Sequence, residues 1–178
     1  ATARRGNLVS AVAMLIAVVV TLLDRSIVDF EWIALGVVIG TVVGVLAARG
    51  SVQSMVVHGH DGMDELTTTE ATSVWELRDG EVTDREVTPE AVGLSRAAAG
   101  DLAGGDPVVN ADIAHRVLGG EGGPHRDLVL LNAAAGLVVA GLADDLVAGI
   151  ELGAAAIDDG RAAGKLDRLV ALGRELDS

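Results

Sequence analysis

The hydrophobic pattern of the chain changes character near residue 50. Before that point, Leu8–Leu23 and Trp32–Ala48 are two apolar runs of 16 and 17 residues without a charged side chain, and the polar segment Asp24–Glu31 separates them. A helix needs roughly 17–25 apolar residues to cross a bilayer. The pattern therefore predicts a transmembrane helical hairpin over residues 1–49, with a lipid bilayer as its partner.

The charges around these runs predict an orientation for the hairpin. Arg4 and Arg5 precede it and Arg49 follows it, whereas the connector is net acidic. Positive residues flank membrane helices on the cytoplasmic side, so we expect a membrane-anchored protein whose C-terminal part is cytoplasmic. If the hairpin does not insert, the whole chain is expected in the cytoplasm. A signal peptide is the alternative, but the second run and the lack of a clear cleavage site after Leu23 argue against it.

From Gly50 onward the pattern alternates between short strands and helices. Ser54–Val57 begins a predicted strand that ends in a glycine-containing turn. Two β-rich runs, Thr72–Arg78 and Glu81–Val87, flank Asp79-Gly80, which is a strong signal for a tight hairpin.

The remaining sequence predicts several helices. Asp106-Pro107 supplies a capping residue and a proline at the first helical position, so Gly104-Gly105-Asp106 is interpreted as a turn rather than a phosphate loop. Gly123-Pro124 opens the next helix, which includes a third apolar run, Leu128–Ala143. We interpret this run as a buried core helix because charges lie close at both ends and Asn132 lies inside it, although periodicity alone also allows a third membrane span. Two further apolar stripes lie within residues 146–157 and 166–170.

Composition separates the same two regions. The whole chain of 178 residues has a net charge of −13, but residues 1–49 hold four arginines and three acidic residues, so the remainder is net −14. So acidic a region argues against nucleic acid as a partner, since nucleic-acid binding needs a basic face. The absence of cysteine excludes disulfides, thiolate metal sites and a cysteine nucleophile.

The candidate chemistry lies after the first predicted strand. Asp64 and Glu65 are adjacent carboxylates in a glycine-containing segment at the strand's carboxyl end, where open α/β sheets bind ligands. Carboxylate oxygens are hard ligands that suit Mg²⁺ carrying a substrate phosphate. A polar surface turn is the competing interpretation. His58 and His60, two residues apart, would share a strand face and could hold a metal, unless His60 already lies in the turn.

The segment His58–Thr68 resembles the second metal-site segment of anthranilate phosphoribosyltransferase. Gly104–Pro107, Val117–Glu121 and Leu130–Ala135 resemble the later half of that family in order and spacing, and the similarity runs from about Gly50 to Leu172. The resemblance implies transfer of a phosphoribosyl group from phosphoribosyl pyrophosphate to anthranilate in tryptophan biosynthesis, with release of pyrophosphate. It also implies a homodimer and Mg²⁺ bound by Asp64 and Glu65.

The resemblance predicts an α/β fold, namely an incomplete phosphoribosyltransferase-type domain over residues 50–178 that follows the hairpin at 1–49. The family's glycine-rich loop, which cradles phosphoribosyl pyrophosphate, has no counterpart before Val56. We therefore expect this chain to lack transferase activity by itself. We assign no catalytic residue.

Residues 1–49 resemble a different family. Ala3–Val12 and Trp32–Gly40 look like an early membrane hairpin of the proton-translocating NAD(P) transhydrogenase β subunit. Neither apolar run carries an ionisable side chain that could move a proton, so no functional residue is transferred from that family. The alternatives to a transferase-family chain are thus a transhydrogenase membrane fragment, or a chimera with no evolved function as one chain.

Overall fold

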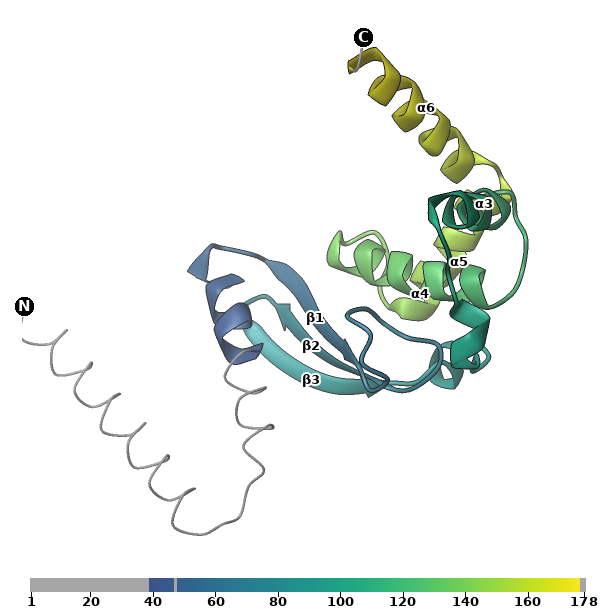
Figure 1. Cartoon of the computed structure of the whole chain (residues 1–178). Helices are drawn as coiled ribbons and strands as arrows, with labels where there is room; N and C mark the ends of the chain where they lie inside the picture. The colour runs from purple at the N-terminus through teal and green to yellow at the C-terminus, as the bar shows by residue number, and fades with distance from the viewer. Residues whose placement is uncertain (1–38, 47, 177–178) are drawn as a thin grey trace, which may run out of the picture. The chain divides into compact units, whose positions relative to one another are not determined.

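The computed structural model describes residues 39–46 and 48–176 of the chain (Figure 1). The chain divides into two units, Ala1–Val45 and Leu46–Ser178. In the first unit the described residues, 39–45, are helical. The predicted hairpin's first apolar run lies outside the described residues, and its second is described only from residue 39.

Residues 48–176 form an antiparallel sheet and a layer of helices. Strands β1 (Gln53–Gly59), β2 (Thr72–Arg78) and β3 (Glu81–Val87) pair in the order β1-β2-β3. The β2–β3 hairpin is confirmed at the predicted residues. Asp79 and Gly80 both have positive φ, 52° and 85°, which is the backbone of a two-residue turn that matches strand twist.

Four helices follow the sheet along the chain, and two short 3₁₀ helices precede them. The elements are η1 (Glu90–Val92), η2 (Ala99–Leu102), α3 (Pro107–Leu118), α4 (Pro124–Val139), α5 (Leu146–Asp158) and α6 (Arg161–Leu176). The Asp106 carboxylate accepts hydrogen bonds from the Val108 and Val109 amides and caps α3. The interpretation of Gly104-Gly105-Asp106 as a turn leading into a capped helix is thus confirmed.

Helix α4 packs against one face of the sheet and contributes buried side chains to both hydrophobic clusters of the domain. Its Leu131, Ala134 and Val138 pack in one buried cluster with Val74 of β2 and Val87 of β3. A second cluster joins α3, α4 and α5 through Val117, Leu130 and Ile157. The apolar run at residues 128–143 is therefore explained by contacts with protein on two sides, as we expected for a core helix. Across residues 39–46 and 48–176, no helix combines the length and apolar character needed to span a membrane.

Helices α4 and α5 pack closely because Gly149 of α5 lies against Ala134 of α4. A Cβ atom at Gly149 would lie 2.8 Å from the Cα and Cβ atoms of Ala134. This close backbone contact fixes the position of α4 relative to α5. Helix α4 in turn holds the loop that follows β1.

Candidate functional site

The segment between β1 and β2 carries the predicted acidic pair, and backbone hydrogen bonds close its base. The His60 amide donates to the Ala71 carbonyl at 2.9 Å, and the Gly59 amide donates to the Met63 carbonyl at 3.0 Å. A Cβ atom at Gly59 would lie 2.6 Å from the Asp61 Oδ1 atom. Glycine at this position therefore allows the Asp61 side chain to fold back over the strand end.

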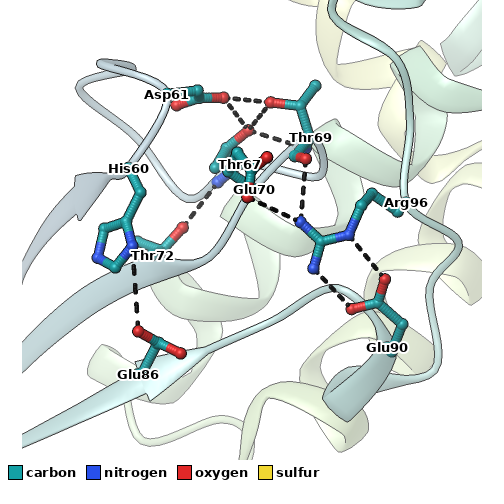
Figure 2. Close-up of polar contacts among 9 residues, drawn as sticks. All are labelled: His60, Asp61, Thr67, Thr69, Glu70, Thr72, Glu86, Glu90 and Arg96. Carbon is teal, nitrogen blue, oxygen red and sulfur yellow. Dashed lines mark hydrogen bonds and ion pairs between the residues drawn. The ribbon is translucent and has the colours of Figure 1, made fainter.

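Asp61 organises the first half of the loop (Figure 2). Its carboxylate accepts hydrogen bonds from the Thr67 hydroxyl at 2.6 Å, the Met63 amide at 3.0 Å and the Thr69 hydroxyl. Burial by itself would raise the pKa of Asp61, but these hydrogen bonds outweigh it and lower the pKa below its ordinary value. Thr67 and Thr69 are buried. The Asp61 carboxylate therefore accepts hydrogen bonds from two buried hydroxyls and links the start of the loop to its later part.

Asn132 of α4 holds the loop just after the acidic pair. Its Oδ1 atom accepts from the Leu66 amide at 3.0 Å, and its Nδ2 atom donates to the Leu66 carbonyl at 2.8 Å. The same Nδ2 atom donates to the carbonyl of Leu128, one turn earlier in α4, at 3.1 Å. Leu66 itself is only 1% exposed. Both backbone polar groups of a buried loop residue are thus satisfied by one side chain.

Arg96 holds the far side of the loop (Figure 2). Its guanidinium donates to the Thr69 carbonyl at 3.0 Å, and it forms ion pairs with Glu70 and Glu90 at 3.2 and 2.9 Å. The loop is therefore attached to the helical layer through α4 and to the segment after β3 through Arg96.

The acidic pair lies between these attachments. Asp64 is exposed and Glu65 is half-buried, and neither carboxylate makes a hydrogen bond or an ion pair within the described part of the chain. Burial, and secondarily the neighbouring Asp64 carboxylate, raises the pKa of Glu65 above its ordinary value. Two adjacent carboxylates, one of them partly desolvated and neither paired with another described residue, are a donor set that suits a divalent cation.

The surroundings restrict what such a cation could be. Among residues 39–46 and 48–176, no group of three or more His, Asp or Glu side chains could hold a metal. The pair can thus supply only a partial coordination shell. This fits Mg²⁺, which keeps several waters and commonly takes its remaining ligands from substrate phosphate oxygens.

The two histidines do not combine into a second metal site. Strand β1 ends at Gly59, so His60 lies in the turn, as one of our two interpretations held. Its Nε2 atom lies 2.9 Å from the Ser73 hydroxyl and its Nδ1 atom 4.0 Å from the Glu86 carboxylate. The His60 ring therefore contacts β2 and β3 rather than sharing a ligand with His58.

The fold of the described domain is similar to that of solved phosphoribosyltransferases. The anthranilate phosphoribosyltransferase of Thermus thermophilus superposes with a TM-score of 0.62 and 41% identity, over 68% of this chain and 36% of that one. The Saccharomyces cerevisiae enzyme, solved in complex with PRPP and Mg, gives 0.59 and 26% identity, over 65% and 33%. The described domain is thus an α/β domain of the phosphoribosyltransferase type.

The sequence comparisons agree with this class. The family model described as "Glycosyl transferase family, a/b domain" matches residues 35–163, and the chain belongs to that family. The anthranilate phosphoribosyltransferases of Lacticaseibacillus paracasei and Caulobacter vibrioides are 53% and 56% identical over 127 and 126 residues, about 71% of this chain. The chain spans a little over a third of the length of these curated relatives, 37%.

The comparisons support the predicted resemblance only for the C-terminal region. The family match begins at residue 35, fifteen residues before Gly50, which we expected to be its start. It therefore enters the second apolar run, which we had assigned to the membrane hairpin. The matches to transferases give no support to the resemblance between residues 1–49 and the transhydrogenase β subunit.

Proposed function

We propose that this chain takes part in anthranilate phosphoribosyl transfer as the C-terminal portion of such a transferase. We further propose that Asp64 and Glu65 bind Mg²⁺ on the pyrophosphate side of the reaction. The observation that carries the proposal is the acidic pair, which has no partner among the described residues, on a loop held by Asp61 and Asn132 within a region more than 50% identical to anthranilate phosphoribosyltransferases. Tryptophan biosynthesis is the corresponding pathway. The same identity favours the transferase over a transhydrogenase fragment.

The chemistry of the pair follows from its charge and position. Bound Mg²⁺ would neutralise the negative charge that grows on the leaving pyrophosphate. Asp64 and Glu65 would hold the ion from one side and leave its other positions to water and phosphate oxygens. Leu66, buried against α4, and Asp61, hydrogen-bonded to Thr67 and Thr69, would keep the two carboxylates in place.

We further propose phosphoribosyl pyrophosphate and anthranilate as the substrates. Structures of the Saccharomyces cerevisiae relative are described as complexes with PRPP and Mg and with 4-fluoroanthranilate. A homodimer is proposed on the sequence resemblance alone. Since the family's glycine-rich loop has no counterpart before Val56, we expect no turnover from residues 1–178 alone. Turnover above that of an Asp64→Ala variant, with both substrates and Mg²⁺, would contradict this expectation.

Calorimetry on the full chain tests the metal site directly. We expect saturable pyrophosphate binding that requires Mg²⁺, and at least a tenfold loss of affinity in Asp64→Asn and in Glu65→Gln. Asp167→Asn removes one exposed negative charge from α6 and is the matched control. Equal affinity in Asp64→Asn, Glu65→Gln and the control would refute the assignment of the pair.

For residues 1–49 the membrane hairpin remains a proposal drawn from sequence, with the C-terminal part in the cytoplasm. Flotation of the full chain with liposomes tests it. Resistance of the bound chain to alkaline carbonate would support insertion, whereas release by carbonate or failure to float would contradict it.

A further inference from the structure

We propose that Asn132 is a positioning residue for the acidic pair, an inference that rests on the proposed metal site. Asn132 belongs to the middle of α4, whose neighbours on the sheet side are apolar and buried. A polar side chain in such a helix is costly unless its hydrogen bonds are made. All three hydrogen bonds of Asn132 are made, and two of them go to the residue directly after Glu65.

The two bonds to Leu66 fix the orientation of two successive peptide planes. The Leu66 amide lies in the same plane as the Glu65 carbonyl, and the Leu66 carbonyl lies in the next plane. A planar carboxamide that bonds both groups, at 3.0 and 2.8 Å, restricts backbone rotation at Leu66 and holds the peptide plane that begins at the Glu65 Cα atom. The Cα atom from which the Glu65 side chain extends is therefore held in place, although the Glu65 carboxylate makes no hydrogen bond to Asn132.

Asn132 is the side chain that hydrogen-bonds the loop to α4 directly after the acidic pair. Before the pair, the Asp61 carboxylate binds the Met63 amide at 3.0 Å. After the pair, Leu66 is attached to α4 through Asn132. Asp64 and Glu65 are the two residues between Met63 and Leu66, so loss of either attachment lets both carboxylates move. Residues that orient metal ligands in this way commonly change metal affinity by about 10–100-fold when they are mutated.

The chain contains a matched control for this contact. Asn110 of α3 makes the same pair of hydrogen bonds to Gly105, with its Oδ1 atom accepting from the Gly105 amide at 2.8 Å and its Nδ2 atom donating to the Gly105 carbonyl at 3.0 Å. The chemistry is identical, but the backbone that Asn110 holds leads into the α3 cap. Asn110 is exposed whereas Asn132 is half-buried, so substitution of Asn110 reports the cost of losing the same pair of hydrogen bonds at the surface.

The test measures Mg²⁺-dependent pyrophosphate affinity of the full chain, at a temperature where a thermal melt shows each variant fully folded. Asn132→Leu keeps the branched shape of the side chain and removes its hydrogen bonds, and we expect a loss of at least tenfold. Asn132→Asp keeps the acceptor for the Leu66 amide but turns a carboxylate oxygen toward the Leu66 and Leu128 carbonyls, and we expect a comparable loss. Asn110→Leu and Asn110→Asp should bind as the unmodified chain does.

The outcomes separate this inference from the proposed function. If the unmodified chain binds and Asp64→Asn does not, but folded Asn132→Leu binds normally, the positioning role is overturned and the metal site stands. If the unmodified chain does not bind, both are overturned. Equal losses in the Asn132 and Asn110 variants would reduce the effect to general destabilisation and would also overturn the positioning role. If Asn132→Leu does not fold, Asn132→Asp decides, and normal affinity in that variant contradicts the proposal.

Discussion

At the scale of single residues, Asp61 stabilises the loop in a way that depends on its charge. Asp61→Asn keeps the side-chain shape but removes the carboxylate that accepts from Thr67, Thr69 and Met63. Hydrogen bonds to charged groups contribute about 1.5–3 kcal/mol each, and part of that is lost to solvent here because Asp61 is exposed. We expect the variant to lower the free energy of unfolding by about 1–3 kcal/mol at pH 7, measured by chemical denaturation.

The stability difference between Asp61→Asn and the unmodified chain should also depend on pH. The pKa of Asp61 is lower in the folded state than its ordinary value of 3.8, so its contribution is complete above that pH and is lost as the pH falls through the folded-state pKa. The stability difference between Asp61→Asn and the unmodified chain should shrink in acid. A difference that is constant from pH 7 to pH 3 would show that the charge of Asp61 does not stabilise the loop.

Glu65 should behave in the opposite sense. Burial and the Asp64 carboxylate raise its pKa above the ordinary value of 4.5, so the folded state binds this proton more tightly than the unfolded chain does. Its stabilising contribution is complete below pH 4.5 and is lost as the pH rises through the folded-state pKa. Glu65→Gln should therefore raise the thermal midpoint at pH 7, relative to the unmodified chain, and the gain should disappear near pH 4.

A control is needed because the whole chain is acidic. Glu151→Gln removes the same charge from an exposed position on α5. If both variants raise the midpoint equally, the effect comes from the net charge and not from the environment of Glu65.

These residues show which parts of the site could be predicted from the sequence and which could not. Asp64 and Glu65 were predicted because the two residues are adjacent in the chain and belong to a motif. The loop contacts made by Asp61 and Asn132 were not predicted. Asn132, for example, lies 66 positions from Leu66 and meets it only through the packing of α4. The available signal was a lone asparagine inside an apolar helix, which indicates a buried partner without naming it.

At the scale of elements, local signals predicted the hairpin and the helix starts. Asp79-Gly80 and Asp106-Pro107 act through the backbone within a few residues, so the β2–β3 turn and the α3 start lie where we expected them. The contact between α4 and α5 had no such signal, because which glycine faces which helix is decided by tertiary packing.

That contact gives a prediction with an internal control. Gly149→Ala would bring a Cβ atom within 2.8 Å of Ala134 Cα and 3.0 Å of its carbonyl oxygen, and helix backbone cannot rotate away. We expect a loss of about 1–3 kcal/mol in the free energy of unfolding, typical of overpacking. Gly136→Ala in α4 meets nothing within 4 Å and should instead gain about 0.5–1 kcal/mol of helix stability. Urea unfolding followed by circular dichroism measures both, and stabilisation by both substitutions would exclude the close helix contact.

At the scale of the whole molecule, the net charge of −13 bears on how an anionic ligand approaches. Basic phosphate sites attract their ligands from a distance, so their association rates fall as salt is added. At the proposed site the net negative charge would repel pyrophosphate at long range, and the attraction would come from Mg²⁺ at short range. Raising the ionic strength from about 0.01 to 0.15 M shortens the screening length from about 30 to 8 Å. This weakens the repulsion more than it weakens the contact between the metal and its ligands.

We therefore expect the association rate of pyrophosphate with the Mg²⁺-loaded chain to rise with ionic strength over this range. Stopped-flow mixing at saturating Mg²⁺ measures the rate, with an inert salt such as tetramethylammonium chloride to avoid competition at the metal. Equilibrium binding of Mg²⁺ alone is the control and should weaken over the same range, since the acidic chain attracts the cation. An association rate that falls with salt would mean that a local basic surface, rather than the metal held by Asp64 and Glu65, recruits the phosphate.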